Sequence, residues 1–160
     1  MTKFGVHVGL QHCHPADLRA AWRRIEDMGF HWISVWDHFY GATGEPTDSE
    51  CLEAVTMHTA LALDTTRVEV GCLVYSVGYR HPAILAKAVT AIDLLSGGRA
   101  AIGLGGGWAQ VEYDAYGIEF PSAGIRLDQL EEAAACVKAL LHQEVSSFSG
   151  RHFSLVDARN

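Results

Sequence analysis

The feature that most constrains the fold is a repeat of one strand followed by one helix, which starts anew about every 32 residues. Apolar runs that suit buried strands begin near residues 4, 32, 68 and 100, and a segment with helical spacing of apolar residues follows each run. Strands that are apolar throughout and alternate with helices are typical of a parallel sheet covered by helices. The sequence therefore predicts an α/β protein with the element order βαβαβαβα.

The boundaries of these elements follow from turn and capping residues. We expect strands over 4–10, 32–36, 68–74 and 100–104, and helices over 15–28, from a cap at Asp48 or Ser49 onward, 82–95 and 123–141. Trp22 has helical spacing with apolar neighbours and is expected in the core. Trp32 and Trp36 share one face of a strand, and at least one of them is expected to pack against a helix. The tail SSFSGRHFSL predicts a turn or hairpin around Gly150.

The number of repeats suggests half of a barrel. Eight such units make about 250 residues, the usual size of a (β/α)8 TIM barrel, whereas this chain of 160 residues holds four. We therefore expect one domain over 1–160, a half-barrel that stops before a fifth strand. A small doubly wound sheet fits the same alternation and stays open as the alternative.

Composition excludes several classes of partner. The net charge is −7 without a cluster of Lys or Arg, which argues against nucleic acid or an anionic membrane as a partner. The longest apolar stretch, 83–95, is broken by Lys87 and Asp93, so no membrane span is expected. The apolar run in MTKFGVHVGLQHCH is too short for an export signal, and four scattered cysteines without a CxxC pair indicate reduced thiols, no cysteine-based zinc site and a cytoplasmic location.

The stretch LLSGGRAAIGLGGGW, residues 94–108, has two readings. GLGGGW follows a strand, but it lacks the Lys-Ser/Thr ending of a P-loop and the third glycine of GxGxxG, so a phosphate-binding loop is weakly supported. In the other reading, SGG ends a helix and forms a turn, and the glycines after the strand keep the carboxyl end of a barrel strand bare for a large flat ligand. Relief of crowding inside a barrel is the plainer alternative.

Several motifs resemble the bacterial luciferase-like monooxygenase superfamily, most closely the branch that uses the deazaflavin coenzyme F420. They extend over essentially the whole chain and comprise WDHF (36–39), YRHP (79–82), LSGGR (95–99), GLGGGW (103–108), Glu112, YGI (116–118), FP (120–121) and Arg126. The resemblance implies a (β/α)8 barrel that holds F420, or alternatively FMN, at its C-terminal mouth.

The resemblance also implies a bulge in the third strand that presses against the flat ring of the cofactor, often with a non-prolyl cis peptide bond. Matched to this sequence, the bulge falls on Cys72, Leu73, Val74 and Tyr75, with the cis bond expected between Cys72 and Leu73. The glycines of the fourth strand's end, Gly105, Gly106 and Gly107, are expected beside the same ring.

Catalysis is expected at Asp37 and His38, directly after the second strand. The resemblance implies that a histidine here contacts the ring system, and an imidazole can exchange a proton near neutral pH while a hydride moves to or from a ring. Asp37 could orient His38. The alternative is a histidine that is merely hydrogen-bonded in a loop.

Other polar residues have weaker assignments. Gln11 and His12 are expected on the substrate side of the pocket, because a metal site at His12-Cys13-His14 lacks an acidic third ligand. Glu112 either caps the next segment or contacts substrate or cofactor, and in the second case it is expected to be a catalytic residue together with Asp37 and His38.

Trp108 occupies the place where F420 dehydrogenases of the family often carry a glutamate. We place it on the substrate side as well. The departure argues against a sugar-phosphate or alcohol dehydrogenase and favours the broader group of F420-type reductases or monooxygenases.

Three functions stay open. The first is an oxidoreductase or monooxygenase that transfers a hydride between F420 (or FMN) and a small organic substrate. The second is a non-catalytic cofactor-binding protein of the same lineage, and the third is a structural half-barrel. Because a four-stranded half-barrel exposes two strand edges and an apolar inner face, we expect a homodimer or, alternatively, a fragment of a longer enzyme.

Overall fold

The computed structural model describes residues 2–41 and 50–160. The chain forms two compact parts, one made of residues 1–75 with 91–103 and the other of residues 76–90 with 104–160. Each part is described by itself. The expected N-caps Asp48 and Ser49 lie outside the described residues.

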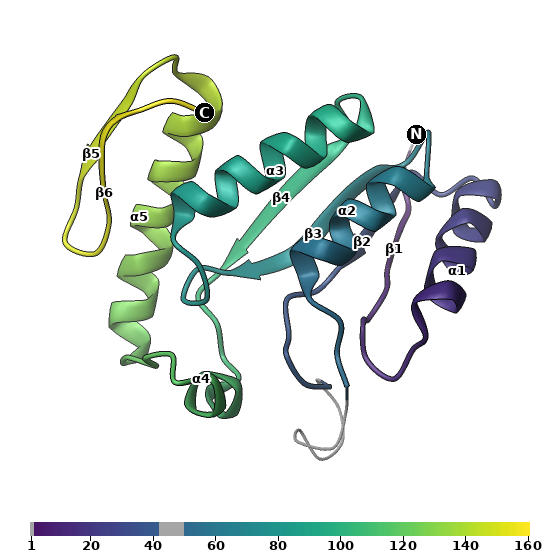
Figure 1. Cartoon of the computed structure of the whole chain (residues 1–160), viewed down its shortest axis with the longest axis horizontal. Helices are drawn as coiled ribbons and strands as arrows, with labels where there is room; N and C mark the ends of the chain where they lie inside the picture. The colour runs from purple at the N-terminus through teal and green to yellow at the C-terminus, as the bar shows by residue number, and fades with distance from the viewer. Residues whose placement is uncertain (1, 42–49) are drawn as a thin grey trace. The chain divides into compact units, whose positions relative to one another are not determined.

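The sheet is parallel, and its strands follow the order in which they occur in the chain, β1-β2-β3-β4 (Figure 1). The strands are β1 (Gly5–His7), β2 (Trp32–Val35), β3 (Glu69–Ser76) and β4 (Ala100–Gly105). In the first part, Gly5 is paired with Trp32, and Trp32 in turn with Glu69. Val70 at the start of β3 donates its N–H to the carbonyl of Arg99 at 2.9 Å. The predicted βα repeat and parallel sheet are confirmed.

Three helices alternate with these strands, namely α1 (Pro15–Asp27), α2 (Ala54–Asp64) and α3 (Pro82–Ser96). One face of the sheet is buried with α1 and α2 through the fully buried side chains of Trp22, Ile33, Val35, Leu61 and Val70. Burial of such large apolar side chains contributes about 1.5–3 kcal/mol each. The expected core position of Trp22 is confirmed.

The start of α2 differs from the sequence-based expectation. The helix begins at Ala54, and the carboxylate of Glu53 caps it by accepting the N–H groups of Val55 and Thr56 at 3.0 and 2.7 Å. The expected cap at Asp48 or Ser49 is therefore wrong. The physical reason is that residues 50–52 are paired with residues 10–12, where Leu52 donates its N–H to the carbonyl of Leu10, so the helix begins only after them.

The hydrogen bonds of Arg99 explain why the LSGGR motif ends in an arginine. Its guanidinium donates to the carbonyl oxygens of Ala62 and Thr65 at the end of α2, to that of Val68 before β3, and to that of Ser96 at the end of α3, each at 2.8 Å. The last carbonyls of a helix have no partner within the helix. One planar side chain with five donors supplies partners for two helix ends at once.

On the opposite face of the sheet, Trp32 of β2 lies over Gly5 of β1, and Trp36, just after β2, lies over Gly9, just after β1. An added Cβ at Gly5 would fall inside the indole of Trp32, and one at Gly9 would come within 2.8 Å of the indole of Trp36. Both indoles therefore lie on the inner face, across the glycines of the neighbouring strand. The expectation that one of them packs against a helix is wrong, because the missing side chains of β1 leave room for them on the inner side.

The second part contains α4 (Gln110–Tyr116), α5 (Ala123–His142) and an antiparallel hairpin of β5 (Ser146–Ser149) and β6 (Ser154–Ala158). The predicted hairpin around Gly150 is confirmed. The Glu132 carboxylate on α5 accepts the N–H groups of residues 151–153 in the hairpin turn, at 2.8 to 3.0 Å. The short helix α4 was not expected. In only two helical turns before Gly117, the spacing of apolar residues does not distinguish a helix from a loop.

Within the described part of the chain, none of the helices combines the length and the apolar character that crossing a bilayer requires.

Candidate active site

A row of ring-bearing side chains follows the inner face of β1 and β2. The Nδ1 atom of His7 lies 2.8 Å from the hydroxyl of Ser34, its paired residue on β2. The ring of Trp36 meets that of His7 edge-on at 5.9 Å between centroids, and it meets that of His38 edge-on at 5.6 Å. Desolvation lowers the pKa of His7. His7, Ser34 and Trp36 were not assigned to the site, although residues two apart on a strand share a face and the period of two was visible in the sequence.

Asp37 and His38 come directly after β2, as expected. Asp37 is buried with 4 % of its surface exposed, and His38 is half-buried at the end of the row. The edge of the Trp36 indole limits the orientation of the imidazole of His38. The structure thus places a proton-exchanging side chain at the carboxyl end of the strand, where parallel α/β enzymes keep their reacting groups.

The end of β3 presents two neighbouring apolar side chains. Leu73 is 52 % exposed and Val74 37 % exposed, whereas Cys72 and Tyr75 are buried. A non-prolyl cis peptide bond joins Leu73 and Val74. The expected cis bond between Cys72 and Leu73 is therefore wrong by one residue, and the two side chains next to the actual bond are the ones that are exposed.

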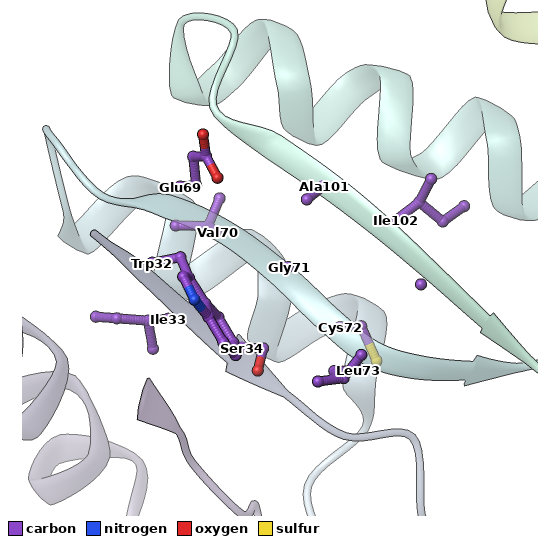
Figure 2. A pocket seen from close by; sticks show the side chains of 11 residues that line it. Trp32, Ile33, Ser34, Glu69, Val70, Gly71, Cys72, Leu73, Ala101 and Ile102 are labelled. Atoms are coloured by element: carbon purple, nitrogen blue, oxygen red, sulfur yellow. The ribbon is translucent and has the colours of Figure 1, made fainter. Parts of the chain in front are cut away.

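A hollow of roughly 320 Å³ lies along β3 from the first residue of the strand, Glu69, to Leu73 (Figure 2). Its middle is sparsely covered, because Gly71 and Gly103 have no side chain and Ala101 has only a methyl group. An added Cβ at Gly103 would meet the carbonyl oxygen of Cys72 at 2.7 Å and the side chain of Val74 at 3.0 Å. Trp32, Ser34 and Leu73 also line the hollow. A floor of glycines with an apolar wall suits a flat, largely apolar group that approaches the backbone.

The segment after β1 is paired with the segment before α2. Gln11 forms an antiparallel bridge with Cys51, and His12 donates its N–H to the carbonyl of Glu50 at 3.1 Å. His12 has a positive φ of 50° and lines a second hollow of roughly 480 Å³ together with Glu50. His14 accepts the N–H of Ala16 and thereby caps α1.

In residues 2–41 and 50–160, no three His, Cys, Asp or Glu side chains converge in a way that could hold a metal ion. His14 serves as the cap of α1, and His12 follows Gln11 in the segment that is paired with residues 50–52.

The glycines at the end of β4 and directly after it, residues 105–107, belong to the second part. The carbonyl of Gly105 accepts the N–H of Val77 at 3.0 Å. Gly107 has a φ of +74°, and an added Cβ there would collide with the hydroxyl of Tyr113. Only glycine adopts this conformation at low cost. Glycine is therefore required at position 107 both by the backbone turn and by the close approach of Tyr113.

Tyr113 connects this turn to a buried polar network. Its hydroxyl lies 2.5 Å from that of Ser76, and its ring lies 4.6 Å from that of Tyr79. The hydroxyl of Tyr79 donates to the carboxylate of Glu112. Glu112 is 2 % exposed, so the structure places this expected catalytic residue inside the network of α4.

Two other residues of the second part were of interest in the sequence. Trp108 is 66 % exposed, which is compatible with its expected place on the substrate side. The guanidinium of Arg126 lies 4.0 Å above the ring of Phe120 and donates to the carbonyl of Pro121 at 2.6 Å. Arg126 and the FP dipeptide of the resemblance thus stabilise the start of α5 together.

Comparison with known proteins identifies the family of this chain. The family model of luciferase-like monooxygenases matches residues 1–160. The F420-dependent glucose-6-phosphate dehydrogenase of Amycolatopsis mediterranei is 31 % identical over 99 % of this chain and 47 % of its own length. The pyrimidine monooxygenase RutA of Bradyrhizobium sp. is 33 % identical over 84 % of this chain and 38 % of its own length.

Solved structures have the same fold. An F420-dependent secondary alcohol dehydrogenase in complex with an F420-acetone adduct superposes with a TM-score of 0.85 at 25 % identity, and 99 % of this chain covers 48 % of that one. The F420-dependent tetrahydromethanopterin reductase of Methanopyrus kandleri superposes with a TM-score of 0.81 at 22 % identity, over 98 % and 45 % of the two chains. The chain spans about half the length of the proteins it matches. The predicted half of a TIM barrel is confirmed, and the chain belongs to the luciferase-like monooxygenase family.

Proposed function

We propose that this chain forms the ring-binding half of a deazaflavin- or flavin-dependent oxidoreductase, with F420 as the cofactor and FMN as the alternative. The observation that carries this proposal is the pair of exposed apolar side chains, Leu73 and Val74, beside a floor that is bare at Gly71 and Gly103. The names of the relatives support the choice of F420 as the first cofactor to test.

The residues present fit a flat ring. Leu73 and Val74 would pack against one face of it, and Gly103 would let it approach the backbone closely. Tyr75 and Cys72 are buried, so they would contribute through their backbone. That Gly105, Gly106 and Gly107 contact the ring is an expectation from the family resemblance, and it is part of the proposal. When bound, either cofactor supplies a centre that accepts or gives up a hydride.

His38 is the group that would hold or release the proton that accompanies this transfer. Its imidazole can both accept and donate a proton near neutral pH. Asp37 precedes it, and the edge of Trp36 limits its orientation. Gln11, His12 and Trp108 would contact a small organic substrate. Glu112 fits a positioning role, because its carboxylate accepts the Tyr79 hydroxyl while almost no surface of it is exposed.

The inner face and the outer edges of β1 and β4 need a cover. We propose that four further strands supply it, from a second copy in a homodimer or from further chain of a longer enzyme. Among the described residues, β1 and β4 are the edge strands of the sheet, and strand edges and apolar surface that face solvent favour association. A cytoplasmic location remains a prediction from the cysteine usage.

The test is a fluorescence titration of the purified chain with F420 and, in parallel, with FMN. We expect saturable binding in the micromolar range. Leu73→Ser should weaken it about ten-fold, because an apolar contact with the ring is lost. Leu94→Ser is the matched control, since Leu94 is 78 % exposed on α3 and faces no part of the hollow.

The outcomes separate the three functions. Binding that Leu73→Ser weakens and Leu94→Ser does not, together with turnover, supports the oxidoreductase. Binding without turnover supports a cofactor-binding protein that does not catalyse. Absence of binding for both cofactors refutes the ring site and leaves the structural half-barrel.

A further inference from the structure

A fully buried histidine on α2 has no part in the function proposed above. His58 faces the helix side of the sheet, and its Nδ1 atom lies 2.9 Å from the hydroxyl of Tyr75 on β3. The two rings are 6.2 Å apart, and Tyr75 is fully buried as well. Burying an imidazole costs free energy unless the ring is hydrogen-bonded. The hydrogen bond of His58 to Tyr75 therefore does more than fill space in the core.

The position of Tyr75 follows from an irregularity in β3. Along a regular strand, successive side chains alternate between the two faces of the sheet. In β3, Leu73 and Val74 are both exposed, and Tyr75 and Ser76 after them are both buried. The alternation is shifted by one residue at this point. Tyr75 therefore lies under α2, where its hydroxyl reaches His58.

Two polar interactions hold the imidazole, the one with the hydroxyl of Tyr75 and a hydrogen bond with the backbone of Val70. Burial lowers the pKa of His58 to about 4, with the backbone of Val70 partly opposing this effect, so the ring is neutral at neutral pH. Among the described residues, none provides a hydrogen-bond partner for the buried Nε2 atom. The contact between Nδ1 and the tyrosine hydroxyl is thus the side-chain interaction that connects His58 to the end of β3.

We propose that His58 is a positioning residue, whose hydrogen bond to Tyr75 fixes the shifted end of β3 and so holds Leu73 and Val74 on the inner face. The bond acts from the helix side of the sheet on the side chains that face the hollow on the other side. The inference rests on the proposed function, in which these two side chains contact the cofactor ring.

Four variants separate the hydrogen bond from packing. Tyr75→Phe removes the hydroxyl and keeps the ring, and His58→Leu removes the imidazole and keeps an apolar side chain. His58→Asn places an amide where Nδ1 lies, whereas His58→Gln places it where Nε2 lies. Leu61→Ala is the control, because Leu61 is fully buried on the same helix and its loss affects stability without touching this bond.

Two readouts are measured, one of which needs no cofactor. Amide hydrogen exchange of residues 69–75 reports local opening of the end of β3. We expect Tyr75→Phe and His58→Leu to raise exchange at residues 73–75 about ten-fold relative to the rest of the sheet, and to weaken F420 or FMN binding about ten-fold. His58→Asn should restore part of both effects, and His58→Gln should not. Leu61→Ala should raise exchange evenly over the first part and leave binding nearly unchanged.

The results distinguish this inference from the proposed function. If the unaltered chain binds neither cofactor, the proposed function fails, and so does the ring-positioning role, whereas the exchange data still decide whether His58 fixes the end of β3. Exchange at residues 73–75 that stays as in the unaltered chain, or that rises as evenly as in Leu61→Ala, overturns the inference. Raised local exchange with unchanged binding overturns it too, because the end of β3 would then not govern the ring contact.

Discussion

Acid should destabilise this protein through His58, well above the pH at which carboxylates become protonated. The pKa of His58 is about 4 in the folded protein, against an ordinary value of 6.5, because the ring is buried between α2 and β3. The unfolded chain therefore binds a proton at His58 in a pH range where the folded protein does not. The contribution of His58 to stability is fully present above pH 6.5 and is lost as the pH falls from 6.5 towards 4.

The size of the effect follows from the two pKa values. Relative to neutral pH, the loss in the free energy of unfolding is about 2 kcal/mol at pH 5 and about 3 kcal/mol at pH 4. A loss of this size is a large fraction of the stability of a typical domain, which is about 5–15 kcal/mol.

The assay is urea unfolding at pH 7, 6, 5 and 4.5, for the unaltered chain and for His58→Leu. Other groups also contribute to the pH dependence in this range, among them His7, whose pKa is lowered by burial. They are common to both proteins and cancel in the difference. We expect the unaltered chain to lose about 2 kcal/mol more than His58→Leu between pH 7 and pH 5. Parallel stability curves would refute the reasoning, because His58 would then titrate alike in the folded and unfolded states.

Three other changes test separate features. His38→Ala should leave cofactor affinity nearly unchanged and slow oxidation of the reduced cofactor by about 10²–10⁴-fold, as followed by absorbance, and unchanged turnover would remove His38 from proton transfer. Gly107→Ala should lower the free energy of unfolding by about 2 kcal/mol or more, whereas Gly124→Ala, a helical position with open space around it, should change it by less than about 1 kcal/mol in urea unfolding. Arg99→Lys should cost about 2 kcal/mol in the same assay, because an ammonium cannot bond the carbonyls of two helix ends at once, and a loss below about 0.5 kcal/mol would contradict this.

Most of the fold could be predicted because its signals are local. Strands that are apolar throughout, Pro15 and Pro82 at helix starts, and glycine after helix ends mark the βα repeat directly in the sequence. The start of α2 could not be predicted, because it depends on a backbone pairing between residues 10–12 and 50–52 that are far apart in the chain. The face chosen by Trp32 and Trp36 likewise depends on the glycines of a different strand.

The site residues that directly follow a strand could be predicted from the sequence. Those whose exposure depends on packing between strands and helices could be predicted less well. Asp37 and His38 follow β2 as expected, and Leu73 and Val74 are exposed beside the hollow. The sequence alone did not distinguish these two from Cys72 and Tyr75, because the shift in the alternation of β3 is a tertiary feature. From the sequence, Glu112 was a candidate for contact with substrate or cofactor. In the structure its carboxylate accepts the hydroxyl of Tyr79, which lies outside α4 and far from Glu112 in the chain.

The close approach of Trp32 to Gly5 and of Trp36 to Gly9 has a consequence for how this surface can change. Position 5 can gain a side chain only if position 32 loses its large ring, and positions 9 and 36 are constrained in the same way. A side chain added at either glycine alone would collide with the facing indole, whereas a second substitution of the tryptophan by a smaller residue would remove the collision. We therefore expect substitutions at these positions to occur in pairs, one at the glycine and one at the facing tryptophan. Related sequences should keep the summed volume of the two side chains rather than the identity of either residue.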